Sequence, residues 1–197
     1  MDRDPFDSPA PLPPLGQVTE VRRSVVTGGP GSGKSTLLVE LAQRGIAIEP
    51  EVARAILRRP GGMALRAEDP AAFARAMFDA ELAAYRAAGA TGATTVFDRG
   101  FPDIVGFLKL EGLPVPSDIA LACRELRYEG PVFRSPPWKA IYRPDAERIQ
   151  DWEGALASDA AVTTAWRESG YHLIDLPRAT VADRAAFVVT RLVSEAR

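Results

Sequence analysis

The sequence is poor in the residues that build disulfide frameworks and metal centres. Its 197 residues include one cysteine, Cys123, and one histidine, His172. One cysteine cannot form an internal disulfide, which is typical of proteins in a reducing compartment, so we expect a cytoplasmic location. A single cysteine and a single histidine also exclude a zinc site built from those two residue types.

Long apolar runs and an excess of charge are missing as well. No stretch approaches the roughly 18 apolar residues that a membrane-spanning helix needs. The N-terminus lacks the basic-then-apolar order of a signal peptide. The formal net charge is -2, without the basic excess that is typical of nucleic-acid-binding proteins. We therefore expect neither a membrane nor nucleic acid among the partners.

The remaining composition is ordinary for one globular domain. Hydrophobic residues make up 46% and charged residues 25% of the chain, and this length and composition allow a sizeable core. Residues 1–20 hold five prolines and little that could pack, so we expect a disordered tail there. Residues 21–197 are predicted to form the folded domain.

A glycine-rich stretch at residues 28–36, GGPGSGKST, matches the phosphate-binding pattern G-x-x-x-x-G-K-[ST]. Residues 22–27 before it can form a short strand, and residues 35–44 after it carry leucines at helical spacing. Strand, glycine loop and helix in this order are the context that the motif requires. A glycine-rich turn that matches by chance is the weaker alternative.

Each residue type in this loop suits a nucleoside triphosphate. Glycines let the backbone bend around phosphates, and the N–H groups at the start of the helix favour an anion. Lys34 can reach the β- and γ-phosphates, and the Ser35 hydroxyl can ligate Mg²⁺. The predicted nucleotide site is the whole loop: Gly28, Gly29, Pro30, Gly31, Ser32, Gly33, Lys34, Ser35 and Thr36.

Strands and helices are predicted to alternate through the rest of the chain. Apolar runs predict four further strands, at 45–48, 94–98, 131–134 and 171–176. Helical patterns follow at 49–59, 70–88, 104–110, 117–128, 145–169 and 180–195. This alternation predicts an α/β fold with a parallel sheet covered by helices on both faces.

Charged residues follow the predicted strands, at the edge where open α/β sheets bind ligands. Glu51 and Arg54 follow the second strand and lie one helical turn apart. Asp98, Arg99 and Asp103 follow the third strand. Because the phosphate loop follows the first strand, we expect these side chains beside the phosphates. The predicted substrate-binding residues are Glu51, Arg54, Asp98 and Asp103.

Three of these residues have predicted chemical roles. Asp98 ends an apolar strand as a Walker B acid does, so it can hold Mg²⁺ through water or polarise an acceptor hydroxyl. Glu51 can bind the acceptor or act as a general base, and Arg99 can contact a transferred phosphate. The structural alternatives are a helix cap for Asp98, a surface ion pair for Glu51 and a surface role for Arg99.

A further stretch, from Trp138 to Arg148, carries Arg143 and Arg148 five residues apart. A segment that closes over the phosphates with arginines would stabilise transition-state charge and exclude water. The alternative is a solvated, charged start of a helix. We predict a lid here, so the predicted catalytic set is Lys34, Glu51, Asp98, Arg99, Arg143 and Arg148.

These motifs together resemble one family. The glycine loop, Glu51-Val52-Ala53-Arg54, Phe97-Asp98-Arg99-Gly100 and the stretch from Pro136-Pro137-Trp138 to Arg148 resemble the AAA_28 group of P-loop ATPases. The same motifs look like the kinase domain of the bacterial NAD-metabolism regulator NadR. They look more distantly like deoxynucleoside and nicotinamide riboside kinases. The likeness covers roughly residues 22–195.

The resemblance implies a fold and an activity. It implies a three-layer P-loop NTPase of the nucleoside-kinase type, with five parallel strands in the order 2-3-1-4-5 and a lid after the fourth. It implies ATP or GTP with Mg²⁺. It also implies that an acid after the second strand, here Glu51, binds or deprotonates the acceptor hydroxyl, and that Asp98 and Arg99 form the pair that follows the third strand.

We therefore expect an ATP- and Mg²⁺-dependent phosphotransferase that acts on a hydroxyl of a small molecule, nucleoside-like or another metabolite. The alternative is a nucleotide-binding switch or slow NTPase that acts through a protein partner. The sequence has no base-reading motif such as the Asn-Lys-x-Asp of GTPases, which favours ATP and leaves GTP open. The acceptor and the oligomeric state are open at this point.

Overall fold

Five short strands form the centre of the fold in the computed structural model, which describes residues 22–142 and 151–194. Neighbouring strands are parallel, and the order across the sheet is β2-β3-β1-β4-β5, which confirms the expected topology. The strands are β1 (Arg23–Thr27), β2 (Ala47–Glu49), β3 (Thr95–Asp98), β4 (Val132–Arg134) and β5 (Leu173–Asp175).

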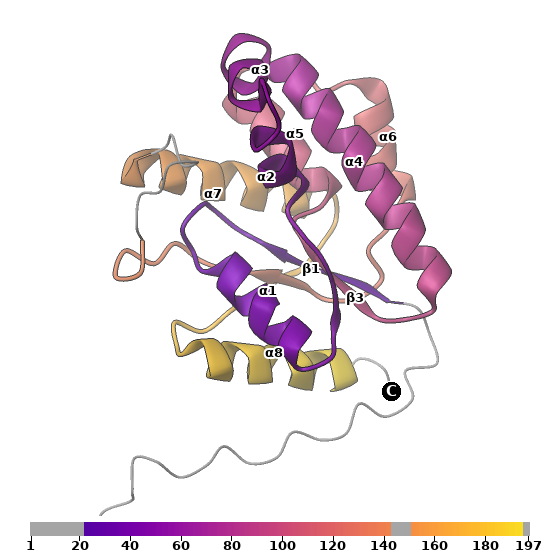
Figure 1. Ribbon diagram of the computed structural model, residues 1–197, viewed down its shortest axis with the longest axis vertical. Helices are drawn as coiled ribbons and strands as arrows, with labels where there is room; N and C mark the ends of the chain where they lie inside the picture. Colours follow the sequence, from indigo (N-terminus) through magenta and orange to yellow (C-terminus); the bar gives the residue numbers. More distant parts are fainter. Residues whose placement is uncertain (1–21, 143–150, 195–197) are drawn as a thin grey trace, which may run out of the picture.

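Helices cover both faces of this sheet, as the alternation of elements predicts. Figure 1 shows α1 and α8 on one side and the other helices on the opposite side, so the fold has three layers. The helices are α1 (Lys34–Gln43), α2 (Val52–Leu57), α3 (Gly62–Glu68), α4 (Pro70–Thr91), α5 (Phe101–Leu110), α6 (Ser117–Glu125), α7 (Trp152–Glu168) and α8 (Val181–Ser194).

Two hydrophobic cores hold the layers together, because successive side chains of a strand point to opposite faces. Val25 and Phe97 pack with apolar residues of α2, α4, α5, α6 and α7. Val26 and Val96 pack with α1 and α8. Cys123 lies in the first core, as its apolar surroundings in the sequence predict. The layers fix the carboxyl ends of β1, β2 and β3 side by side.

The region between β2 and α4 differs from the prediction. The helix predicted over 49–59 begins only at Val52, because Glu49 ends β2 and the following Pro50 disfavours helical backbone at its predecessor. Helix α3 was not predicted, since Gly61 and Gly62 looked like a helix stop. A Cβ on Gly62 would lie 2.1 Å from the Ile56 carbonyl oxygen, so this glycine permits the close turn from α2 into α3.

Other boundaries agree within a few residues. The Asp69 carboxylate caps α4 by accepting from the Ala72 N–H at 2.9 Å, and Pro70 opens the helix as predicted. Helix α7 occupies the described part of the helix predicted over 145–169. The predicted tail, Arg143 and Arg148 lie outside the described residues. In the described part of the chain, no helix has the length and apolar character that crossing a membrane requires.

Candidate functional site

The glycine loop joins β1 to α1 and folds tightly against the end of β4. Gly28 has a φ of 129°, and a Cβ there would lie 2.4 Å from the backbone oxygen of Ser135. Only glycine accommodates that backbone angle and that approach. The Ser135 hydroxyl also donates to the Ser32 carbonyl at 2.6 Å, so Ser135 contacts the loop at both Gly28 and Ser32.

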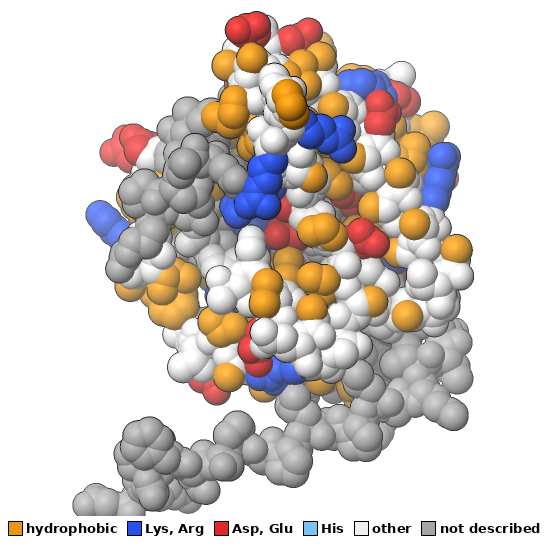
Figure 2. All heavy atoms as spheres, viewed as in Figure 1, with side chains coloured by type: hydrophobic (Ala, Val, Ile, Leu, Met, Phe, Trp, Pro, Cys, Tyr) orange, Lys and Arg blue, Asp and Glu red, His pale blue; other side chains and the backbone are white. Residues whose placement is uncertain are grey.

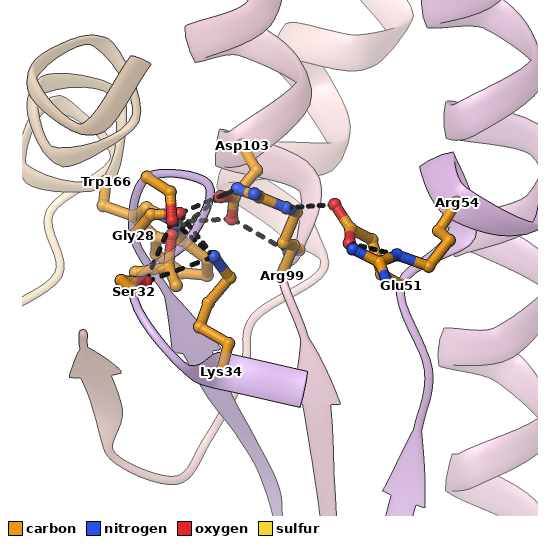
Figure 3. Close-up of polar contacts among 11 residues, drawn as sticks. Gly28, Ser32, Lys34, Glu51, Arg54, Arg99, Asp103 and Trp166 are labelled. Atoms are coloured by element: carbon orange, nitrogen blue, oxygen red, sulfur yellow. Dashed lines mark hydrogen bonds and ion pairs between the residues drawn. The ribbon is translucent and has the colours of Figure 1, made fainter. Parts of the chain in front are cut away.

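Lys34 is the cation of this loop. Its Nζ donates to the carbonyl oxygens of Gly28 at 2.9 Å and Gly29 at 2.7 Å, as Figure 3 shows in part. Burial, together with the nearby Arg99 charge, lowers the pKa of Lys34 to about 8. A polyphosphate beside the amine would favour its charged form, because an opposite charge within a few ångströms stabilises ionisation.

Arg99 connects the loop to Glu51, the residue that precedes α2. Its Nε donates to Glu51 Oε1 at 2.7 Å, and its Nη1 donates to the Gly28 carbonyl at 3.1 Å and to Asp103 Oδ1 at 3.0 Å (Figure 3). The backbone of Arg99 has a φ of 79°, in the left-handed region that non-glycine residues rarely adopt. Such strain is typical of functional sites, where surrounding contacts hold it in place.

Glu51 is held ionised between two arginines. Burial alone would raise the pKa of Glu51, but the charges of Arg99, Lys34 and Arg54 outweigh it and lower the pKa below its ordinary value. Arg54 Nε lies 3.7 Å from Glu51 Oε2, which is the ion pair that the sequence offers as the structural alternative to a site role for Glu51. The structure thus brings Glu51, Arg54 and Arg99 together beside the loop, as the sequence predicts.

Asp103 is the most extensively bonded carboxylate of the site. Besides Arg99, it accepts from the Thr27 hydroxyl at 2.7 Å, the Trp166 indole N–H at 2.8 Å and the Gly100 N–H at 3.1 Å. These contacts join the end of β1, the start of α5 and the end of α7. They give Asp103 a positioning role, and its predicted contact with substrate stays a prediction.

Asp98 ends β3 beneath this network. Its side chain is buried, and Oδ1 has no hydrogen-bond partner among the described residues. Burial, with the Glu51 charge adding to it, raises the pKa of Asp98 to about 6. A buried carboxylate oxygen without a donor suits a hard cation or a water bound to one, as does the exposed Ser35 hydroxyl at the start of α1. The described residues contain no cluster of three metal-ligating side chains.

One carboxylate at the loop was missed. Asp159 of α7 accepts from the Gly29 N–H at 3.1 Å through Oδ1 and from Arg134 Nη2 at 2.6 Å through Oδ2. Arg134 also donates to Asp175 Oδ1 at 3.0 Å. Arg134 could have been found, because it is the last residue of an apolar strand that ends at the same edge. Asp159 gave no signal, since it lies within a helix that carries many polar residues.

A cavity of about 210 Å³ opens beside these residues. Its lining begins at the loop with Gly33, Lys34 and Ser35, passes Glu51, Arg54 and Arg99, and continues along α4 and α5. Figure 2 shows basic and acidic side chains next to one another near the middle of the visible face. Asp98 lies outside this lining.

Glu81 also lines the cavity and was missed. It lies four residues after Met77 and four before Tyr85, so it occupies the apolar stripe of α4. A carboxylate on such a stripe is the signal that could have identified it.

Comparisons with known structures support the fold. Deoxyadenosine kinase from M. mycoides, solved with dCMP and dCDP, has a TM-score of 0.68 and 14% identity, covering 87% of this chain and 99% of the other. NadR, solved with NR, has a TM-score of 0.62 and 18% identity. The match covers 88% of this chain and 51% of NadR. A search of curated proteins found no match.

The family assignment rests on a sequence comparison. The family model of AAA_28, described as an AAA domain, matches residues 23–184 and therefore covers the loop, the strand-end residues and most of the described helices. The chain accordingly belongs to the AAA_28 family.

Proposed function

We propose that this protein transfers the γ-phosphate of ATP to a hydroxyl group of a small, nucleoside-like acceptor. The observation that carries the proposal is the shared cavity, whose lining includes both Lys34 of the phosphate loop and Glu51 after β2. A donor phosphate and an acceptor hydroxyl bound in one cavity would be held next to each other, which is the main requirement of phosphoryl transfer.

The donor half is the glycine loop. The N–H groups at the start of α1 and the Lys34 amine would bind the phosphates. Ser35 and Asp98 are the residues that would hold Mg²⁺, directly or through water, and the unpartnered Asp98 oxygen fits that role. Magnesium supplies neutralisation of phosphate charge in this reaction class.

The acceptor half is Glu51 with its arginines. An ionised Glu51 can accept a hydrogen bond from the acceptor hydroxyl and orient it toward the γ-phosphate, with its own position fixed by Arg99. Because its pKa is lowered, Glu51 is a weak base and is better suited to orienting the acceptor hydroxyl than to removing its proton. Phosphoryl transfer depends chiefly on positioning and charge stabilisation. Arg54 and Arg99 lie where they could contact acceptor or phosphate.

The remaining expectations belong to the same proposal. Arg143 and Arg148 would close over the γ-phosphate as parts of a lid. Residues 21–197 would act as one kinase domain in the cytoplasm, with ATP preferred and GTP open. We propose no nucleic-acid partner.

The structural neighbours support a nucleoside-like acceptor. Deoxyadenosine kinase was solved with dCMP, dCDP and dATP, and NadR with NR and with NAD and AMP-PNP. A hollow site also favours an acceptor over the alternative of a nucleotide switch, which would need an exposed surface for a protein partner.

The experiment is transfer of labelled phosphate from ATP to a panel of nucleosides, sugars and amino alcohols, with and without Mg²⁺. We expect Glu51→Gln to lower transfer by about 100-fold while ATP affinity stays within about two-fold, because a positioning contact near the reacting atoms is lost. The control is Glu40→Gln, which removes a carboxylate paired with Arg44 on α1. Equal transfer by wild type and Glu51→Gln would refute the assigned role of Glu51.

A further inference from the structure

Apolar side chains form a large part of the cavity wall. Phe73 and Phe107 lie edge-on, with ring centroids 5.6 Å apart. The apolar residues of this wall come from four helices: Leu57, Phe73, Met77, Ile104, Phe107 and Val162. A wall of this kind suits a flat ring, which gains from contact with apolar and aromatic surfaces.

Glu81 interrupts this apolar wall. Its side chain lines the cavity, and the residue is 3% exposed. The Tyr128 hydroxyl donates to Glu81 Oε1 at 2.6 Å and itself accepts from the Phe101 N–H at 3.3 Å. The single hydroxyl proton of Tyr128 is therefore committed to Oε1, and this contact fixes the orientation of the carboxyl group.

The surroundings of Glu81 keep it protonated at neutral pH. Burial raises the pKa of Glu81 to about 8, against the lowering effect of the Tyr128 hydrogen bond. The negative charges of Asp103, Glu49 and Asp98 add to the rise. The remaining charged residues of the cavity lining are Lys34, Glu51, Arg54, Arg66 and Arg99.

A neutral carboxyl group offers one O–H donor and one carbonyl acceptor side by side. Its natural complement is an edge with one acceptor next to one donor, as in an amide or an amidine. Nucleobases and aromatic carboxamides carry such edges on flat rings. A leucine or methionine in place of Glu81 would fill the same space without the free-energy cost of burying a carboxyl group. A role in binding the ligand would explain why a glutamate occupies this position.

We propose that Glu81 reads the ring of the acceptor, by pairing with an amide- or amidine-type edge while the hydroxyl end of the acceptor lies at Glu51. This rests on the proposed function, because it takes the cavity to be the acceptor site. It names the acceptor as a ring compound with a paired donor and acceptor, and it makes Glu81 a specificity-determining residue.

The test uses two substitutions of Glu81. Glu81→Gln keeps a donor and an acceptor and can still bind Tyr128, whereas Glu81→Leu keeps only the volume. The probes are 2′-deoxyadenosine, 2′-deoxycytidine and nicotinamide riboside, titrated by calorimetry in the presence of a non-hydrolysable ATP analogue. Asp79→Asn, on the exposed side of α4, is the control.

We expect at least one probe to bind the wild type. The Kd of that probe should stay within about three-fold of the wild-type value in Glu81→Gln at neutral pH. It should rise by about 10- to 100-fold in Glu81→Leu, because the donor and acceptor on the ring of the probe then lose their buried hydrogen bonds. The wild-type Kd should rise above about pH 8, and the Glu81→Gln Kd should not. Equal Kd values for Glu81→Gln and Glu81→Leu would overturn the proposal.

A second comparison does not depend on the folding of Glu81→Leu. If the bound probe is 2′-deoxyadenosine or 2′-deoxycytidine, the deaza analogue that has CH in place of the ring nitrogen of the paired edge lacks the acceptor. If it is nicotinamide riboside, nicotinic acid riboside lacks the amide donor. Either analogue should bind the wild type at least ten-fold more weakly than its parent. Equal binding of parent and analogue, or no binding of any probe, overturns the role of Glu81. Binding that depends on Glu81 but leads to no phosphate transfer would contradict the kinase function and would still support the role of Glu81 in ring recognition.

Discussion

At the scale of single residues, Lys34 is the clearest link between sequence and chemistry. It is one of three lysines in the chain, and its amine lies against the carbonyls of the loop that should bind phosphate. Burial lowers the pKa of the Lys34 amine to about 8. An anion is the partner that would restore the charge.

Lys34→Ala should weaken binding of ATP by about 10- to 100-fold, since a charged hydrogen bond contributes about 1.5–3 kcal/mol. Titration with a fluorescent ATP analogue measures this. The matched control is Lys109→Ala, which removes an exposed lysine paired with Glu168. Unchanged affinity in Lys34→Ala would contradict the assignment of the nucleotide site.

Glu81 should make the stability of the protein depend on pH. Its pKa rises from 4.5 to about 8 on folding, so between these values the folded protein keeps a proton that the unfolded chain releases. The stability from this group is fully present below about pH 4.5 and is lost as the pH rises through about 8. Each pKa unit corresponds to about 1.4 kcal/mol.

The Glu81→Gln side chain cannot ionise, so its unfolding free energy should not change with pH through this residue. The difference in unfolding free energy, variant minus wild type, should therefore increase by a few kcal/mol between about pH 5 and about pH 8. Urea unfolding at both pH values measures this change. Asp79→Asn should leave the pH dependence unaltered. Parallel curves for wild type and Glu81→Gln would show that Glu81 is not protonated in the folded protein.

At the scale of elements, α7 holds the glycine loop in place. Asp159 joins the Gly29 N–H to Arg134, and Asp103 binds the Trp166 indole of the same helix. A Cβ on Gly29 would lie 2.6 Å from the Ala155 carbonyl oxygen, so helix and loop are in direct contact. The position of α7 therefore sets the shape of the phosphate site.

Asp159→Ala should destabilise the protein by about 2–4 kcal/mol, because it leaves the Gly29 N–H without its acceptor and removes one partner of Arg134. ATP affinity should fall with it. Asp175, whose side chain is 59% exposed, also pairs with Arg134, and Asp175→Ala should cost less than about 1 kcal/mol. Equal losses of stability for Asp159→Ala and Asp175→Ala, measured by thermal or urea unfolding, would show that Asp159 does not hold the loop against α7.

The elements differ in how well the sequence predicts them. The glycine loop and the Asp69 cap follow from short, local patterns, whereas the strand order was expected only from the family resemblance. Helix α3 does not follow from such a pattern, because its start depends on the close approach of Gly62 to α2 and on the left-handed backbone of Gly61, whose φ is 78°. Glu51, Arg54 and Arg99 were predicted because they follow strands whose ends meet. Asp159 and Glu81 were missed because they reach the site from the middle of helices.

At the scale of the whole molecule, the three layers join two halves of one site. The sheet places the glycine loop after β1 beside Glu51 after β2 and Arg99 after β3. Helices α2, α4, α5 and α7 lie above the sheet (Figure 1). Side chains from these four helices line the cavity that begins there. A phosphate donor and a small acceptor are the ligands that this arrangement fits best.

The most direct test of this account is the ATP turnover of the wild-type protein with Mg²⁺, measured with and without the nucleoside panel. We predict that at least one nucleoside raises turnover at least ten-fold and that each ATP consumed yields one phosphorylated nucleoside, since one shared cavity holds donor and acceptor together. Turnover that no acceptor raises above its basal rate would contradict the account.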